Sequence, residues 1–301
     1  MNLSERLSKD RLAIFLFHGV VDESNYAVRN YTNKHIGREV FCQMMRELKE
    51  NGRAVSMDEV VGYWEAGEKL PGRSFAITFD DGFENNYLVA APILKDLEVP
   101  ATFYVATDFI ENNSMSWIDR IEYCLDQTGK GCLTFIWDGS EHRFRTNEDK
   151  ILILDRIRAR VKSDRSVDPD IVASDVFAQC GMDEIESNNG PLDSKMSWEQ
   201  VRELSGHGNF TVGGHSHTHK ILSYLEAEKL DFEVKTSINL LKEKAGIEPR
   251  HYSYPEGLEQ CFSDDVAAFL EGFGVRCCPT AVDGINDLHD SLFKLKRITV
   301  V

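Results

Sequence analysis

Two adjacent carboxylates follow a short apolar run in the first third of the chain. Ser74 to Thr78 predicts a buried strand, and Asp80 and Asp81 come where that strand should end, directly before Gly82. Neighbouring strand residues point to opposite sides, so the two acids diverge unless the chain turns there, as Gly82 permits. Ionised carboxylates must stay hydrated, be paired or bind a cation. An exposed turn is one interpretation of this pattern, and a cation site is the other.

Three of the nine histidines lie within five residues far downstream, after the apolar run Phe210 to Val212. His215 and His219 are four residues apart, which lets both imidazoles face one point if a helical turn starts there, whereas His217 would face elsewhere. Two imidazoles and one carboxylate form the open, three-ligand kind of site that catalytic zinc uses. An exposed polar loop is the alternative. Together with the aspartate pair, the cluster favours metal binding.

These segments resemble the signature motifs of a known family. Thr78-Phe79-Asp80-Asp81-Gly82 and His215-Ser216-x-x-His219 are similar to the first two motifs of the polysaccharide deacetylases, the NodB-like carbohydrate esterases. Phe15 to Val20, Pro100 to Val105 and Tyr252 to Gly257 resemble three further stretches of that family, the last being its third motif. The resemblance covers nearly the whole chain except a middle segment.

The resemblance implies a metal-dependent site. Asp81, His215 and His219 would hold a divalent ion, expected to be Zn²⁺, with Co²⁺, Ni²⁺, Fe²⁺ and Mn²⁺ as alternatives. Asp80, one residue from a ligand, is placed to take a proton from the attacking water as general base. The products would be acetate and a free amine.

The other family roles are less fully matched. The third motif implies that the backbone N–H of Glu256 helps to hold the oxyanion, and it places Tyr254 among the substrate-binding residues. Ser253 stands where the best-known form of this motif has an arginine that orients the catalytic aspartate. For the acid that protonates the leaving amine, His289 and His18 are the two candidates. An exposed loop for His289 and a buried structural histidine for His18 are the alternatives.

Composition excludes some partners and gives an expectation for location. The 301 residues contain 34 Lys and Arg against 50 Asp and Glu, for a net charge of -16. This balance argues against nucleic acid or an anionic membrane surface as the main partner. Met1 to Arg11 is polar, and His18 and Gly19 interrupt the apolar run from Leu12 to Val21. We therefore expect a cytoplasmic protein without an integral membrane segment.

Strand and helix patterns alternate along the chain. The pattern predicts parallel strands joined by crossover helices, with functional residues at the carboxyl ends of strands. With the family resemblance, we expect a single domain over residues 1–301 with a distorted (β/α) barrel. The acidic and basic residues of the helix expected at 226–245 are interpreted as a solvated face. Further strands are expected at 12–17, 101–106, 251–254, 275–278 and 295–300, and further helices at 38–51, 56–65, 84–97, 197–204 and 264–271.

The segment from about residue 110 to 195 breaks this alternation and is interpreted as an insertion. It contains a helix candidate at Lys150 to Lys162 and a possible hairpin around Leu133 to Phe144. Trp117 is a candidate to stack on a sugar ring, and an ordinary amphipathic helix is the equally weighted alternative. We expect the insertion to influence substrate choice.

The sequence therefore predicts a hydrolase that removes an N-acetyl group from a sugar in a glycan or glycan precursor. A cytoplasmic location would favour nucleotide-linked or lipid-linked substrates over finished polymer, and hence a role in surface-polysaccharide biosynthesis. Two alternatives are a deformylase of a formylated amino sugar and a catalytically weakened barrel that binds a glycan or a protein. The presence of Asp80 argues against the second, because a metal site without catalysis needs no base.

Overall fold

A parallel β-sheet forms the centre of the computed structural model, which describes residues 3–23 and 26–301. Its strand order is β10-β1-β5-β6-β9, and short β4 pairs with the start of β5. Every pairing in this sheet is parallel, as the alternation of strands and helices predicts. The strands are β1 (Ala13–Phe17), β4 (Arg53–Ala54), β5 (Ser74–Phe79), β6 (Ala101–Val105), β9 (Phe210–Gly214) and β10 (Ile298–Thr299).

Single bridges and backbone hydrogen bonds close this sheet into a distorted (β/α) barrel. Parallel bridges continue it from β9 to residues 251–252 and from there to Cys277. The N–H of Thr280 then donates to the carbonyl of Leu295, in the segment that leads into β10 beside β1. The strands predicted at the end of the chain are therefore much shorter than expected. One reason is local: the N–H of Cys278 donates to the carbonyl of Leu292, which lies in a loop, and not to a residue of a neighbouring strand.

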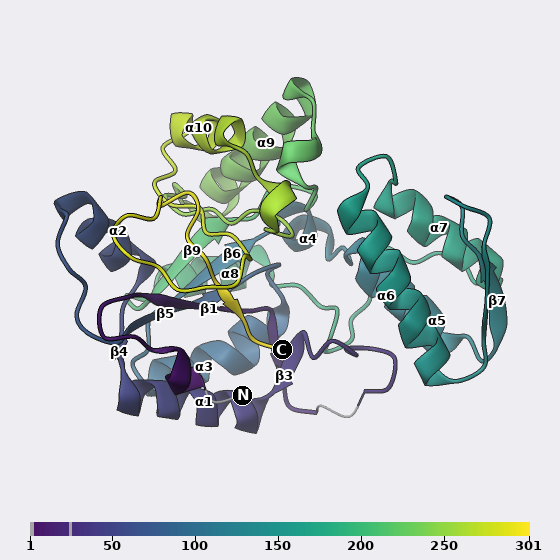
Figure 1. Ribbon diagram of the computed structural model, residues 1–301, viewed down its shortest axis with the longest axis horizontal. Helices are drawn as coiled ribbons and strands as arrows, with labels where there is room; N and C mark the ends of the chain where they lie inside the picture. The colour runs from purple at the N-terminus through teal and green to yellow at the C-terminus, as the bar shows by residue number, and fades with distance from the viewer. Residues whose placement is uncertain (1–2, 24–25) are drawn as a thin grey trace.

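Helices surround this sheet, as Figure 1 shows. The predicted helices are present, and a π-helical turn, Asn86–Ala90, precedes α3. On the neighbouring strands β1, β5 and β6, the ring of Phe79 stacks between those of Phe17 and Phe103, at centroid distances of 5.4 and 5.0 Å. No helix in the described residues is both long and apolar enough to span a membrane. The helices outside the insertion are α1 (Arg38–Asn51), α2 (Met57–Ala66), α3 (Ala91–Asp96), α4 (Thr107–Asn112), α8 (Trp198–Ser205), α9 (Ala227–Ala245) and α10 (Asp264–Gly272).

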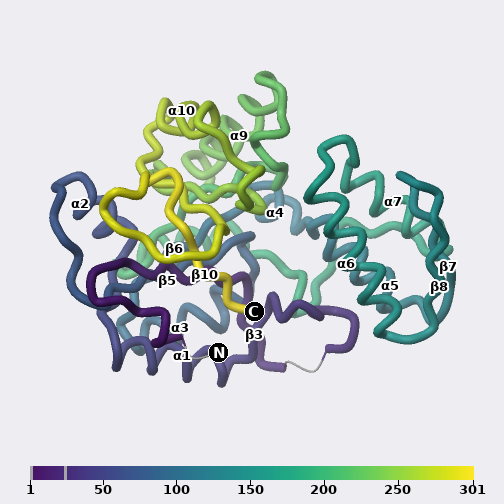
Figure 2. The backbone as a smooth tube through the Cα atoms, in the orientation of Figure 1, coloured from purple at the N-terminus to yellow at the C-terminus, as the bar shows by residue number. Residues whose placement is uncertain are grey.

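The insertion folds beside the barrel as a mainly α-helical lobe, drawn in teal in Figure 2. Its helices and hairpin pack around a hydrophobic cluster separate from that of the barrel. We call residues 117–180 the insertion lobe. The predicted hairpin is present as antiparallel strands β7 and β8, and the predicted helix is present as α6. The lobe contains α5 (Trp117–Gln127), β7 (Gly131–Thr134), β8 (Glu141–Phe144), α6 (Asn147–Ser163) and α7 (Pro169–Cys180). A separate parallel pair, β2 (Gly19–Val21) and β3 (His35–Gly37), follows β1.

Candidate active site

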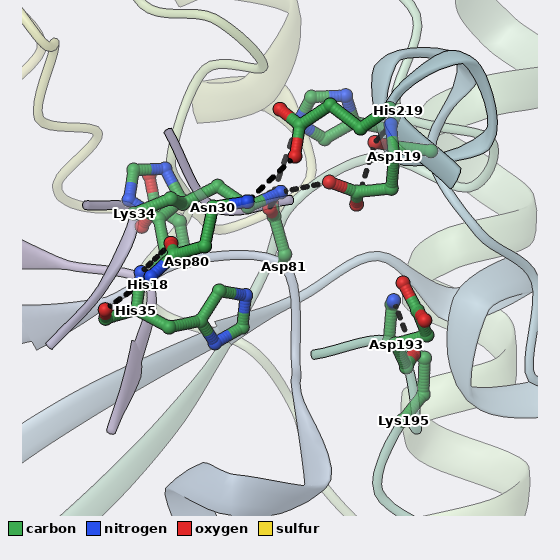
Figure 3. A network of polar contacts seen from close by, with 12 residues as sticks. His18, Asn30, Lys34, His35, Asp80, Asp81, Asp119, Asp193, Lys195 and His219 are labelled. Carbon is green, nitrogen blue, oxygen red and sulfur yellow. Dashed lines mark hydrogen bonds and ion pairs between the residues drawn. The ribbon is translucent and has the colours of Figure 1, made fainter. Parts of the chain in front are cut away.

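The aspartate pair lies at the carboxyl end of β5, where the chain turns sharply. Asp81 has a left-handed backbone with φ of 75°, and Gly82 continues the turn with φ of 83°. Both carboxylates are buried, and Figure 3 shows Asp80 and Asp81 together beside His18. A left-handed conformation is unfavourable for a residue other than glycine and occurs often at functional sites. The turn thus keeps two adjacent acids at one end of the barrel.

The histidines come from the loop after β9, which is not helical. The predicted helical turn is wrong, because Ser216 and His219 both have left-handed backbones, with φ of 62° and 58°. This irregular path still brings the rings of His215 and His219 together, with centroids 4.8 Å apart. His217 faces away as expected, and its Nδ1 lies 2.9 Å from Oγ1 of Thr107.

Asp81, His215 and His219 form a group that fits a divalent metal ion. Their ligand atoms lie within 4.8 Å of one another, and Oδ1 of Asp81 is 3.6 Å from Nε2 of His215 and 3.3 Å from Nε2 of His219. Nδ1 of His215 lies 2.8 Å from the carbonyl oxygen of Ser253. A carbonyl only accepts, so Nδ1 carries a proton, and Nε2, on the side of Asp81, is the atom that would bind a cation.

The electrostatics of this group also suit a cation. Burial raises the pKa of Asp81, but its contacts with the His215 and His219 imidazoles outweigh the effect of burial and hold this pKa well below its usual range. The pKa of His219 is raised, since contact with Asp81 outweighs the opposing effect of burial. The carboxylate therefore stays ionised, and a bound cation would take over the stabilisation that the imidazoles provide.

Asp80 forms a fully buried ion pair with an arginine that the sequence analysis missed. Nη1 and Nη2 of Arg297 each lie 2.8 Å from one carboxylate oxygen of Asp80. Oγ of Ser253 donates to Asp80 at 3.1 Å and accepts from Arg297 at 2.8 Å. Burial raises the pKa of Asp80, but the charges of Arg297 and His215 lower it below its ordinary value. An arginine within the strand expected at 295–300 was the only local signal, because a guanidinium that a barrel buries requires a partner.

A cavity of about 210 Å³ adjoins the metal group and is bounded by both the barrel and the insertion lobe. The lobe contributes residues of α5 and α6, including Trp117, Arg158 and Lys162. Trp117 lies in the wall, but most of its side chain is packed in the core of the lobe. Glu256 faces Lys162 across the cavity wall, with Oε2 and Nζ 2.5 Å apart. The insertion therefore forms part of the candidate site.

Two predicted site residues lie outside this cavity. The side chain of Tyr254 is buried in a hydrophobic cluster, and its hydroxyl donates to the carbonyl of Phe293, so it does not face a substrate there. His289 is exposed and lines a different pocket with Trp64, because its backbone N–H is fixed in a turn by Asp287. The prediction of His289 as the acid for this site is therefore wrong, as is that of Tyr254 as a substrate-binding side chain.

His18, the other candidate for the acid, does line the cavity. Burial lowers its pKa to about 4, although the charge of Asp81 acts in the opposite direction. Its Nδ1 is buried and has no hydrogen-bond partner in the described residues. His18 is therefore a neutral imidazole at neutral pH.

Ion pairs fix the insertion lobe to the barrel beside the metal group. Nζ of Lys34 lies 2.6 Å from Oδ1 of Asp119 in α5 and 4.0 Å from Oδ2 of Asp81, as Figure 3 shows. Burial raises the pKa of Asp119, but the charge of Lys34 outweighs it, and this carboxyl is ionised at any ordinary pH. The N–H of Asn30 donates to Glu122 of the same helix at 3.0 Å. These contacts hold one wall of the cavity in place.

Comparisons with known proteins agree with this arrangement. The family model described as "Polysaccharide deacetylase" matches residues 67–278. A poly-beta-1,6-N-acetyl-D-glucosamine N-deacetylase of Staphylococcus aureus strain MSSA476 is 30% identical over 99 residues, and the same protein of strain MRSA252 matches equally. The match spans 33% of this chain and 33% of each relative.

Solved structures of similar fold cover nearly the whole chain. The Streptococcus pyogenes deacetylase PplD, solved in complex with acetate, superposes with a TM-score of 0.62 at 17% identity. IcaB from Ammonifex degensii superposes with a TM-score of 0.59 at 19% identity. Each alignment covers 98% of this chain and 94% of the other. At these identities the likeness concerns the fold.

Proposed function

Because the chain belongs to the polysaccharide deacetylase family, we propose that it hydrolyses the N-acetyl amide of a sugar at the site formed by Asp80, Asp81, His215 and His219. As a member of this family it is a hydrolase of amide N-acetyl bonds. The observation that carries the assignment is the position of Asp80. This buried, ionised carboxylate lies directly beside a metal-ligand group and is held in one orientation by two hydrogen bonds from Arg297.

Asp81, His215 and His219 would hold the divalent ion. Zn²⁺ suits one carboxylate and two imidazoles with positions left open, and Co²⁺, Ni²⁺, Fe²⁺ and Mn²⁺ share these ligands. When bound, the ion would supply a Lewis acid that polarises the amide carbonyl and makes water more acidic.

Asp80 serves as the base in this proposal. Its Oδ2 lies 3.9 Å from Nε2 of His215, so a proton acceptor adjoins the ligand group. The low pKa of Asp80 keeps it ionised at neutral pH, which lets it accept a proton as water attacks the carbonyl carbon. When the C–N bond breaks, the leaving nitrogen takes that proton, and the products are acetate and an amine. His18 is neutral before the reaction begins. It can therefore act as the acid for the leaving nitrogen only after it has itself received the proton that water gave up.

The backbone N–H of Glu256 is assigned to the developing oxyanion. Glu256 has a left-handed backbone with φ of 60°, and the carbonyl of Pro255 before it accepts from Gly257 at 2.7 Å. Among the described residues, the Glu256 N–H donates to no protein acceptor. Glu256 lines the cavity that adjoins the metal group, and a fixed N–H without a partner is the kind of donor that stabilises a tetrahedral oxyanion.

The substrate is proposed to present one N-acetylated sugar residue at a time. The cavity volume of about 210 Å³ lies below the roughly 300–1,000 Å³ of pockets that bury a drug-sized ligand. The relatives' names point to N-acetylglucosamine linked in polymers. A cytoplasmic location, which we also propose, would direct the enzyme toward nucleotide-linked or lipid-linked precursors in surface-polysaccharide biosynthesis.

The release of acetate and formate from a substrate panel tests this function. The panel contains N-acetylated and N-formylated nucleotide sugars, lipid-linked oligosaccharides and β-1,6-linked N-acetylglucosamine oligomers, each incubated with Zn²⁺-loaded protein. We expect acetate from at least one N-acetylated substrate and none from the Asp80→Asn variant. Formate alone would identify a deformylase. No release by a protein that has bound Zn²⁺ would contradict the proposal.

A further inference from the structure

The loop that carries both histidine ligands has a conformation that its own residues do not favour. We call residues 215–219 the metal loop. Ser216 and His219 both have left-handed backbones, and neither is glycine. Such residues persist only where the surrounding structure holds them in place. The contacts that hold this loop therefore decide where the His219 imidazole lies relative to Asp81.

A buried carboxylate from α9 holds the middle of the metal loop. Oε2 of Glu233 accepts from the N–H of His217 at 2.9 Å and from that of Thr218 at 2.8 Å. Oε1 of Glu233 accepts from the hydroxyl of Thr218. The side chain is only 4% exposed, so the interpretation of the charged α9 residues as a solvated face is wrong for Glu233. Hydrogen bonds to an ionised acceptor in a buried setting are stronger than neutral ones.

A second contact, from Tyr252, holds the start of the metal loop and is supported by the same helix. The hydroxyl of Tyr252 accepts from the N–H of Ser216 at 2.8 Å and lies 3.2 Å from Oγ of Ser237, to which it donates. Ser237 is one helical turn after Glu233, so Glu233 and the residue that supports Tyr252 lie on one face of α9. The ring of Tyr252 occupies the space beside Gly214 that a Cβ atom would fill, at 2.3 Å. Glu233 of α9 thus binds two successive N–H groups of the loop, and Tyr252, which contacts Ser237 of the same helix, binds the N–H before them.

We propose that Glu233 is a positioning residue for the metal centre, which sets divalent-ion affinity by fixing the metal loop. His219 directly follows Thr218, whose N–H and hydroxyl both bind this carboxylate. Loss of the carboxylate leaves two buried N–H groups without an acceptor and frees the loop to place the His219 imidazole elsewhere. The inference uses the metal group of the proposed function but does not depend on turnover.

The affinity for Zn²⁺, measured by competition with a chromophoric chelator, tests this role directly. Removing groups that orient metal ligands commonly weakens metal affinity about 10–100-fold, and we expect this loss for Glu233→Ala. A smaller loss is expected for Glu233→Gln, because its amide oxygen can still accept from the two N–H groups. Thr218→Val removes only the side-chain hydrogen bond and should change affinity least.

Leu241→Ala is the matched control for general loss of stability. Leu241 is fully buried on the same helix but contacts the barrel core, so this variant should lower Tm and leave Zn²⁺ affinity unchanged. Glu233→Ala also has a second readout, the visible absorption spectrum of the Co²⁺-loaded protein, which should change because the ligand geometry changes, whereas Glu233→Gln should keep a spectrum closer to that of the wild type. Wild-type Zn²⁺ affinity and an unchanged Co²⁺ spectrum in Glu233→Ala would overturn the proposal. A wild-type protein that binds neither ion would overturn both this inference and the metal site, whereas absence of acetate release would affect only the proposed function.

Discussion

Arg297 and Asp80 lie 217 positions apart in the chain, yet they form a buried ion pair with two hydrogen bonds of 2.8 Å. Arg297 precedes β10, the short strand that pairs with β1, and Asp80 follows β5 on the other side of β1. Ser253, which stands where the family resemblance places an arginine, bonds to both partners. In this chain the guanidinium that contacts Asp80 therefore comes from the residue directly before the last strand.

Replacing Arg297 should impair catalysis more than substrate binding. In Arg297→Met the Asp80 carboxylate loses both hydrogen bonds, and we expect kcat to fall about 100-fold, a typical cost of a slightly misplaced group. KM and metal content should change little, because Arg297 does not line the cavity and contacts none of the three expected metal ligands. The variant should also lose about 3–5 kcal/mol of stability, since a buried charge is left unpaired. Steady-state kinetics and urea unfolding measure the two effects.

The double variant Ser253→Arg/Arg297→Ser is the control for this prediction. It returns a guanidinium to Asp80 from position 253, whose side chain already contacts Asp80, so it should recover part of kcat relative to Arg297→Ser alone. A wild-type kcat in Arg297→Met would show that the ion pair between Arg297 and Asp80 contributes to folding stability and not to catalysis.

Breaking the contact between Lys162 and Glu256 should affect substrate binding. This pair joins α6 of the insertion lobe to the loop that presents the Glu256 N–H. Both side chains are partly exposed, so the attraction between their charges is worth at most about 1 kcal/mol. If all of this energy holds the cavity wall in its binding shape, Lys162→Met raises KM by up to about fivefold. The charge-reversed pair Lys162→Glu/Glu256→Lys should have a lower KM than Lys162→Glu alone. Equal KM values for these two variants would indicate that the ion pair does not shape the cavity.

His18 should make the protein sensitive to mild acid. Its folded pKa of about 4 lies below the roughly 6.5 of an exposed histidine, so the unfolded chain binds more protons. The free energy of unfolding therefore has its full value while His18 is neutral in both states, above about pH 6.5, and it decreases as the pH falls toward 4. Between pH 6.5 and 5 this loss is up to about 2 kcal/mol.

Urea unfolding of metal-free protein at pH 7.5 and pH 5 measures this effect. The His18→Gln variant removes the titrating group, so its midpoint should fall less between the two pH values than that of the wild type. An identical fall in both proteins would contradict the low pKa of His18.

The sequence predicted the parts of the site that follow local rules. Asp80, Asp81 and His215 lie directly after strands, and the carboxyl ends of parallel strands meet at one end of a barrel. Arg297 could not be assigned this way, because its partner is 217 positions distant and only barrel closure brings the two together. Glu233 resembled its charged neighbours on α9, and nothing local shows which turn of a helix faces a loop.

The errors have the same physical origin. Nothing in the local sequence around His289 indicates which face of the fold its loop lies on, and the structure places it at another pocket. Tyr254 lies next to functional positions in the motif, but its ring points into a hydrophobic cluster. The spacing of His215 and His219 suits a helical turn, whereas two left-handed residues produce the same convergence in the structure.

The most direct test of the account measures bound Zn²⁺ and released acetate side by side for the wild type, Asp80→Asn and His215→Ala, with an N-acetylated substrate from the panel. The account predicts that Asp80→Asn binds Zn²⁺ but releases no acetate, and that His215→Ala loses both. Acetate release by Asp80→Asn, or full Zn²⁺ content in His215→Ala, would contradict it.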